Sequence, residues 1–268
     1  MHTLTKVILL AILQGVAEFL PVSSSGHLVI ASRLLGLELP GLRLETMLHF
    51  GTLLAVCGFY RQRLWSLLTG LARREPAACR ETGLLLLASL PIVVVYLAAH
   101  ARLEACYEDH RLAAAMLIVT GLLLLSLPFR RLDAARRPAP ESAPLGWWRA
   151  FVIGLAQAVA ILPGISRSGA TIATARHLGI DARRAAEFSF LMSVPPLLGA
   201  TLLHGFRPEP AAGASAVGWG LLGAGTLVAA LVGYAAIAFL IRVLSSGRFW
   251  IFGVYCLLAG GIVLLSGL

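Results

Sequence analysis

The hydrophobic positions of this 268-residue chain are gathered in stretches long enough to cross a lipid bilayer. An α-helix rises about 1.5 Å per residue, so roughly 20 apolar residues span the ~30 Å hydrocarbon core. Six uninterrupted stretches meet or approach this length, at about 44–60, 82–99, 112–128, 186–204, 216–241 and 249–267. The pattern predicts six transmembrane helices.

Two further apolar stretches, residues 4–35 and 150–178, are interrupted near their middle by proline, glycine and serine. The interruptions read Pro21-Val-Ser-Ser-Ser-Gly-His27 and Pro163-Gly-Ile-Ser-Arg-Ser-Gly169. Non-helical backbone at membrane depth is tolerated only where protein or a polar cavity satisfies its hydrogen bonds. Each stretch is therefore predicted to form a re-entrant helix–loop–helix hairpin.

The composition supports an integral membrane protein with an all-α fold. Apolar residues make up 58% of the chain and charged residues 13%, about half of the roughly 25% charged residues in soluble domains. This balance excludes a soluble globular enzyme, a disordered regulator and a disulfide-stapled secreted domain. The four cysteines show no CxxC spacing, which argues against a zinc site or a disulfide framework.

The chain has a net charge of +9. A strongly positive charge can indicate a protein that binds nucleic acid. Here the arginines fall in short runs between apolar stretches, as the positive-inside rule predicts, so no nucleic-acid partner is expected. The arginine-rich segments 61–80 and 129–149 are expected on the cytoplasmic side, and the more acidic segment 100–111 outside, with both termini outside. The Pro/Ala-rich residues 132–146 are predicted to be a surface linker.

An internal repeat relates the two halves of the chain. An offset of 143 residues aligns Gln14–Gly26 with Gln157–Gly169, with six of thirteen positions identical. A chance match is the alternative, but the matched residues include the rare polar ones. Each half has one hairpin and three spans, an odd number, so the second half starts on the opposite side. One membrane domain (1–268) with inverted-topology repeats at 1–128 and 147–268 is predicted, with a polar site at their interface.

The first hairpin contains ionisable side chains, which are costly within a membrane and therefore indicate function. These are Glu18 and His27, and Gln14 lies one helical turn before Glu18 on the same helix face. Carboxylate and amide oxygens suit Mg²⁺ or Ca²⁺, so Glu18 and Gln14 are candidate metal ligands. The alternative is that Glu18 caps a helix or pairs with an arginine only for packing.

The turn of the first hairpin has the residues of an anion-binding corner: Ser23, Ser24, Ser25 and Gly26. Hydroxyls and free backbone N–H groups at a helix start bind anions, and Gly26 would let an anion approach closely. A serine-rich helix cap without a ligand is the alternative. The adjacent His27 favours function, because an imidazole beside an anion can transfer protons or attack phosphorus.

The second hairpin resembles a phosphate cradle in composition but lacks the spacing of a Walker A loop. Its candidate phosphate-binding residues are Ser166, Arg167, Ser168 and Thr171. Arg167 at membrane depth needs an anionic partner, and its planar fork suits phosphate oxygens. A structural pair with Glu18 or Glu187 is the alternative.

Four other ionisable residues, His49, His204, Glu45 and Glu187, lie near the ends of predicted spans. They are expected to be interfacial or supporting rather than catalytic.

Two segments resemble motifs of the bacterial undecaprenyl-pyrophosphate phosphatases. Gln14-x-x-x-Glu18-Phe-Leu-Pro-Val-Ser-Ser-Ser-Gly-His27 resembles their [E/Q]xxxE…PxSSxGH segment. Pro163-Gly-Ile-Ser-Arg-Ser-Gly-Ala-Thr171 resembles their PGxSRSxxT segment. The likeness extends over essentially the whole chain in length, order and spacing.

The resemblance implies an integral membrane hydrolase of the bacterial cytoplasmic (inner) membrane, acting at its outer, periplasmic face. It would remove the terminal phosphate of undecaprenyl pyrophosphate and so recycle undecaprenyl phosphate, the lipid carrier for peptidoglycan synthesis. It also implies dependence on a divalent metal and bacitracin resistance when the protein is abundant. Its partners would be the polyprenyl pyrophosphate lipid and membrane lipids; the oligomeric state stays open, a homodimer included.

By position, the resemblance assigns Glu18 and Gln14 to the metal and pyrophosphate region and Arg167 to phosphate binding. Gln14 replaces the glutamate of many relatives, which removes a charge from the metal site. We expect His27, or Ser24 assisted by His27, to attack the terminal phosphorus, with direct attack by water as the rival. A transporter or lipid flippase is the competing class of function.

Overall fold

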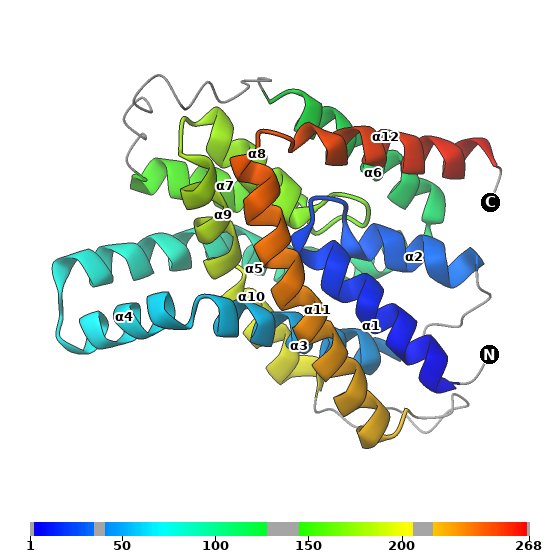
Figure 1. The fold of residues 1–268 in the computed structure, drawn as a ribbon, viewed down its shortest axis with the longest axis horizontal. Helices are drawn as coiled ribbons and strands as arrows, with labels where there is room; N and C mark the ends of the chain where they lie inside the picture. The colour runs from blue at the N-terminus through cyan, green and yellow to red at the C-terminus, as the bar shows by residue number, and fades with distance from the viewer. Residues whose placement is uncertain (1–2, 35–40, 128–144, 206–216, 267–268) are drawn as a thin grey trace.

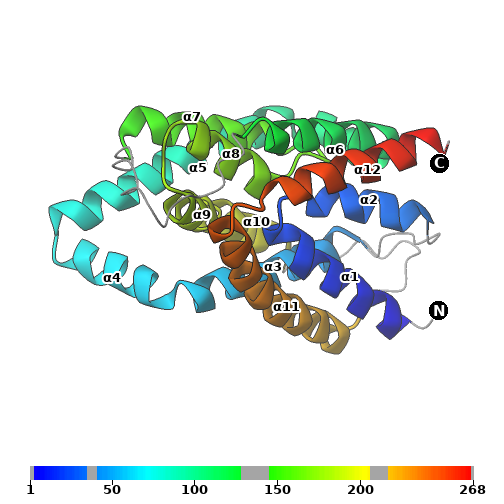
Figure 2. The ribbon, with the colours of Figure 1, turned by 45° about the horizontal axis from the view of Figure 1, so that its top comes forward.

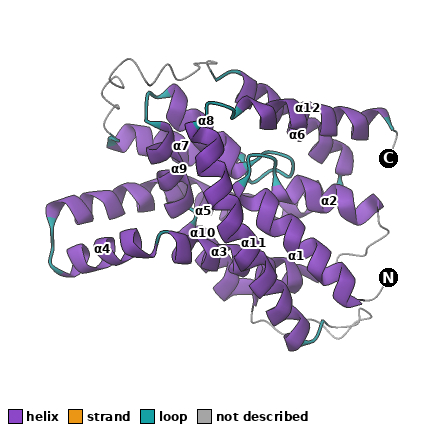
Figure 3. Cartoon of the chain, in the orientation of Figure 1, coloured by secondary structure: helices purple, strands orange, loops and turns teal. Residues whose placement is uncertain are grey.

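The computed structural model describes residues 3–34, 41–127, 145–205 and 217–266. These residues form helices and turns, and no strand occurs among them (Figures 1 and 3). The first half forms α1 (Thr3–Phe19), α2 (Ser24–Leu34), α3 (Gly41–Phe59), α4 (Arg61–Ala72), α5 (Pro76–Glu108) and α6 (His110–Leu125). The second half forms α7 (Trp147–Val159), α8 (Arg167–His177), α9 (Ala182–Leu191), α10 (Val194–Ala200), the π-helical turn η1 (Thr201–Gly205), α11 (Trp219–Ser245) and α12 (Trp250–Leu265). The prediction of an all-α protein is confirmed for these residues.

Three segments of the described chain are long and apolar enough to cross a membrane. They are Pro76–His100, Ala182–His204 and Trp219–Ser245. Two shorter helices, His110–Leu125 and Trp250–Leu265, are also apolar. Many leucines on these helices point outward, where lipid rather than water would cover them. The protein is therefore a membrane protein.

Both interrupted stretches form two helices joined by a turn. Pro21 lies in the turn between α1 and α2, and Pro163 in the turn between α7 and α8. Proline lacks the N–H that a continuing helix needs, so these turns lie where the sequence predicts them.

The charged segment 61–80 differs from the expected loop, because it forms α4 and the start of α5. The two helices make an arm that extends away from the remaining helices (Figures 1 and 2). Gly70 on α4 allows α4 and α5 to approach closely, since a Cβ on this residue would lie 2.6 Å from the Cβ of Ala78 on α5. Likewise α5 continues beyond residue 99, so much of the expected outer loop at 100–111 is helical. Most of the predicted linker 132–146 lies outside the described residues.

The helices of the two halves pack against one another rather than as separate bodies. α6 lies along α12, α11 packs against α1 and α3, and α5 packs against α7. At the centre, the rings of Phe19 and Phe190 meet edge to face with centroids 5.4 Å apart, and both are fully buried. The turns of both hairpins are thereby placed in the interior, in contact with each other.

Candidate functional site

The turns of the two hairpins approach closely because glycines face each other. A Cβ on Gly26 would lie 2.8 Å from the Cα of Gly164. Gly164 itself has φ +95°, and a Cβ there would overlap the carbonyl oxygen of Ala113. The sequence suggested that Gly26 leaves room for an anion; in the structure Gly164 takes the space beside its Cα. These glycines therefore bring the polar turns together.

Gly164→Ala should destabilise the protein. A side chain at this positive φ costs about 1–3 kcal/mol, and the overlap with the Ala113 carbonyl adds to that cost. The expected result is a lower unfolding temperature in detergent, measured by the change in helical circular dichroism. Gly223→Ala is the matched control, because a Cβ on this α11 glycine meets nothing within 4 Å. Equal unfolding temperatures for the Gly164 variant and the wild type would contradict the close approach.

Both hairpins begin their second helix with the same serine cap. The Ser23 Oγ accepts a hydrogen bond from the Gly26 N–H at 3.2 Å, and the Ser166 Oγ accepts one from the Gly169 N–H at 3.1 Å. These residues are the aligned positions of the repeat. Ser23 and Ser166, which the sequence predicts to bind phosphate, thus satisfy helix N–H groups in the structure.

Three other predicted phosphate-binding hydroxyls also have partners within the protein. Ser25 Oγ lies 3.3 Å from Ser23 Oγ. Ser168 Oγ donates to the Leu20 carbonyl at 3.3 Å, which ties the second hairpin to the first. Thr171 Oγ1 donates to the Arg167 carbonyl at 2.7 Å. Of these contacts, that of Ser168 joins the two turns and the other two lie within one hairpin. Contact with phosphate stays a prediction for these residues.

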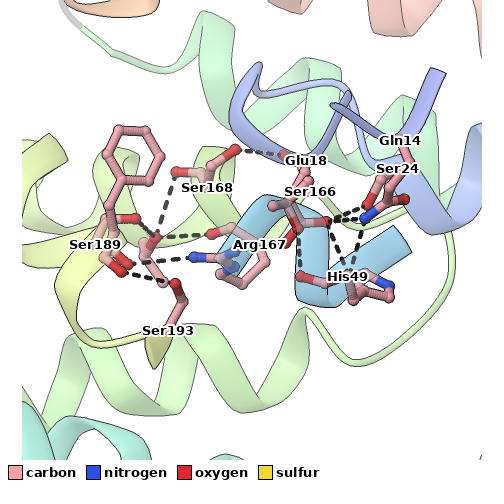
Figure 4. A network of polar contacts seen from close by, with 12 residues as sticks. Gln14, Glu18, Ser24, His49, Ser166, Arg167, Ser168, Ser189 and Ser193 are labelled. Atoms are coloured by element: carbon pink, nitrogen blue, oxygen red, sulfur yellow. Dashed lines mark hydrogen bonds and ion pairs between the residues drawn. The ribbon is translucent and has the colours of Figure 1, made fainter. Parts of the chain in front are cut away.

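An ion pair joins the two turns at the centre of the site (Figure 4). The Arg167 Nη2, at the first residue of α8, lies 2.6 Å from the Glu18 Oε1, near the end of α1. Their side chains are only 14% and 6% exposed. Of the two glutamates that the sequence offers as partners for Arg167, the structure selects Glu18.

Three further side chains surround the Glu18 carboxylate, as Figure 4 shows. Ser24 Oγ donates to Oε2 at 2.7 Å, and Gln14 Nε2 donates to the same oxygen at 3.0 Å. His49 Nδ1 lies 3.5 Å from this oxygen and 2.9 Å from Gln14 Nε2. One carboxylate therefore connects residues of α1, α2, α3 and α8.

The place of His49 differs from the sequence-based prediction. The apolar stretch was expected to begin near residue 44, which put His49 close to a span end. α3 begins at Gly41, so His49 lies in the middle of the helix. The rule that indicates function for ionisable groups at membrane depth would have identified it.

The partners of His27 lie outside the ion pair. Its Nδ1 lies 2.9 Å from the Ser23 carbonyl oxygen, and its Nε2 lies 2.7 Å from the hydroxyl of Tyr255 on α12. The two rings stack with centroids 5.6 Å apart. Both ring nitrogens thus have partners, and Ser24 pairs with Glu18 instead. The expected Ser24–His27 pair is not formed in this arrangement.

Glu187 belongs to a second group of charges, on the other side of α9 from Ser189. Arg184 bonds Glu187 at 2.8 Å and both carboxylate oxygens of Glu81 at 2.5 Å. Arg63 bonds Glu187 at 3.0 Å. These ion pairs fasten the α4–α5 arm to α9, in keeping with a supporting role for Glu187.

The residues around Glu18 fit a metal ion only in part. The described residues contain no group of three or more His, Cys, Asp or Glu that could hold a metal. Gln14 Oε1, however, is buried and has no hydrogen-bond partner among the described residues. Mg²⁺ is commonly held by one or two carboxylates, with phosphate oxygens and water completing its shell. Glu18 and Gln14 therefore fit a cation whose other ligands come from a phosphorylated molecule.

Comparison with known proteins identifies the family of this chain. The family model described as "Bacitracin resistance protein BacA" matches residues 7–262. The chain is 41% identical to an undecaprenyl-diphosphatase of Rhodopirellula baltica, with 100% of each chain covered. It is 36% identical to one of Desulfatibacillum aliphaticivorans, with 99% of each covered, and 39% identical to one of Salinibacter ruber, with 96% and 97% covered. The chain belongs to the bacitracin resistance protein BacA family.

Proposed function

We propose that this protein is a membrane-embedded phosphatase that hydrolyses undecaprenyl pyrophosphate to undecaprenyl phosphate and inorganic phosphate. The observation that carries the proposal is the buried Glu18–Arg167 pair, with Ser24 on the same carboxylate. It combines an anion-binding cation, a base and a hydroxyl group, which suit phosphoryl transfer. The names of the related proteins support the same reaction. The product would be the recycled carrier for peptidoglycan synthesis, and the activity would confer bacitracin resistance.

The architecture proposed with this function is one membrane domain (1–268) of two inverted repeats, 1–128 and 147–268. Each repeat has one re-entrant hairpin and three spans. The matched serine caps of the two hairpins support this architecture. The packing also supports it, because the first helix of each hairpin packs on a long helix of the other half: α1 packs on α11, and α7 packs on α5. With the arginine-rich segments on the cytoplasmic side, we assign the chemistry to the periplasmic face of the inner membrane.

In the proposed mechanism, Arg167 binds oxygens of the pyrophosphate that enters between the turns. Its charge is balanced by Glu18, so the incoming anion takes over guanidinium donors and frees the carboxylate. Glu18 then accepts the proton of Ser24, and the Ser24 Oγ forms a bond to the terminal phosphorus. The bridging P–O bond breaks, undecaprenyl phosphate leaves, and water hydrolyses the phosphoserine. A divalent cation, Mg²⁺ or Ca²⁺, held by Glu18 and Gln14 Oε1 would neutralise phosphate oxygens.

Direct attack by water, with Glu18 or His27 as the base, is the rival route. The 2.7 Å hydrogen bond between Ser24 and Glu18 favours serine. His27 would first have to leave the Tyr255 hydroxyl to take part. A phosphorylated Ser24 trapped by acid quenching and identified by mass spectrometry would establish the covalent route, and a phosphate-free Ser24 during turnover would overturn it.

The function is tested with purified protein in detergent, supplied with undecaprenyl pyrophosphate. We expect one phosphate released for each substrate molecule, and loss of release when a chelator is added. In liposomes, lipid movement across the bilayer without phosphate release would overturn the phosphatase proposal in favour of a transporter.

Gln14→Glu should lower the Mg²⁺ concentration that gives half-maximal activity. A second carboxylate beside Glu18 adds charge to the proposed metal site, and ligand charge sets divalent affinity, so we expect a decrease of about tenfold. Gln157→Glu is the matched control, because Gln157 is the buried counterpart in the other half and its amide contacts the Ala88 carbonyl. An unchanged Mg²⁺ requirement in the Gln14 variant would remove this residue from the metal site.

A further inference from the structure

The helix that carries Glu187 breaks where a continuous span was expected. α9 ends at Leu191 and α10 begins at Val194, within the predicted span 186–204. The cause lies in the sequence: Pro195 and Pro196 lack the N–H groups that would bond the carbonyls of Leu191 and Met192. The break therefore changes which backbone carbonyls in the last turn of α9 have helical partners.

A third carbonyl at the end of α9, that of Ser189, also lacks its helical partner and contacts the site. In a continuous helix the Ser193 N–H would bond the Ser189 carbonyl, but here it donates to the Phe190 carbonyl at 3.3 Å. The Ser189 carbonyl instead accepts a hydrogen bond from Arg167 Nη1 at 3.3 Å. The guanidinium is thus held from two sides, by Glu18 on α1 and by the end of α9 (Figure 4).

The side chain of Ser189 makes a second link to the same arginine. Its Oγ lies 2.6 Å from Thr171 Oγ1, which in turn donates to the Arg167 carbonyl at 2.7 Å. Both Ser189 and Thr171 are fully buried. Ser189 therefore contacts the guanidinium through its carbonyl and supports the arginine backbone through Thr171.

We propose that Ser189 is a positioning residue for Arg167, and that the break between α9 and α10 makes its carbonyl available for this task. The inference rests on the proposed function, in which Arg167 binds the pyrophosphate. Arginine has five N–H donors in one plane. When the substrate displaces Glu18, the Ser189 carbonyl still holds Nη1, so the plane keeps its direction and the other donors face the phosphate oxygens.

The first test removes the hydroxyl link. Ser189→Ala and Thr171→Val should each raise the KM for undecaprenyl pyrophosphate and the Kd for inorganic pyrophosphate about tenfold, the effect of losing one buried hydrogen bond. The change in kcat should be smaller. Thr171→Ser keeps a hydroxyl and should restore both constants.

Ser89→Ala is the matched control. The buried Ser89 Oγ donates to the Met192 carbonyl at 2.9 Å, so it supports the same helix break without touching Arg167. This variant should lower the unfolding temperature as Ser189→Ala does, but leave KM and Kd unchanged. Equal increases in KM for the two serine variants would overturn the inference, since both would then act through stability.

A double-mutant cycle gives the decisive result. If Ser189 acts through the guanidinium, Ser189→Ala should have no further effect on Kd in an Arg167→Lys background. The same tenfold increase in both backgrounds would overturn the proposal. Calorimetric binding of inorganic pyrophosphate needs no turnover, so it tests the positioning role even if the wild-type protein releases no phosphate, an outcome that would instead end the proposed function.

Discussion

Glu18→Gln should reduce the rate of phosphate release from undecaprenyl pyrophosphate by roughly 10³-fold. In the proposed mechanism the carboxylate accepts the proton of Ser24, and removing a general base typically costs 10²–10⁴-fold. Glutamine keeps the size, and its single amide oxygen can still accept from Arg167 as Oε1 does, but an NH2 group replaces Oε2 and cannot accept the proton of Ser24. The measurement is single-turnover phosphate release by the purified variant.

The same variant has a second expected property that separates chemistry from binding. With chelator present, inorganic pyrophosphate should bind Glu18→Gln at least as tightly as the wild type, because Arg167 no longer has a competing carboxylate. Glu81→Gln is the control, since this buried glutamate is also paired with arginines but lies in the group that fastens the α4–α5 arm. Turnover by Glu18→Gln at the rate of Glu81→Gln would contradict the assignment of Glu18 as the base.

The sequence predicts the two polar turns well because their signals are local. Proline in an apolar stretch marks a turn, and a serine just before the next helical run marks a helix cap. The structure has this arrangement in both hairpins, at Ser23 and Gly26 and at Ser166 and Gly169. The internal repeat, whose two copies are offset by 143 residues, then predicts that the two turns belong to one site. The Glu18–Arg167 contact agrees with this prediction.

The partners of individual side chains could not be predicted, because they depend on packing between distant segments. His27 pairs with Tyr255, 228 residues away, and no periodicity along the chain reports that contact. The helix break before Pro195 and Pro196 is visible in the sequence, but the use of the Ser189 carbonyl is not, since it requires the end of α9 to lie beside Arg167. His49 was misplaced because hydropathy locates helix ends only within a few residues.

In the proposed reaction both halves of the chain contribute to one site. The first half supplies the carboxylate and the hydroxyl, and the second half supplies the guanidinium. Neither charge would be tolerated alone at this depth, because an unpaired buried ion costs several kcal/mol. Pairing them compensates both charges, and an anionic substrate that displaces Glu18 keeps the charge of Arg167 compensated.

Arg167→Ala should lower kcat/KM by about 10²–10³-fold, the usual effect of removing a group that stabilises developing oxygen charge. Arg167→Lys should fall between this variant and the wild type, because lysine keeps the charge but loses the planar fork. Arg176→Ala is the matched control on the same helix. Arg176 lies in the last turn of α8, and its guanidinium donates to the Ile180 carbonyl at 2.9 Å.

Added guanidinium ion provides a further test of the same residue. It should restore part of the activity of Arg167→Ala by entering the space beside Glu18, and it should not stimulate the wild type or Arg176→Ala. Wild-type kcat/KM in Arg167→Ala would contradict a role in phosphate binding and would leave the arginine as a partner that only balances the charge of Glu18. The decrease in kcat/KM of Arg167→Ala therefore decides whether the Glu18–Arg167 ion pair is only a packing contact or half of a phosphate-binding site.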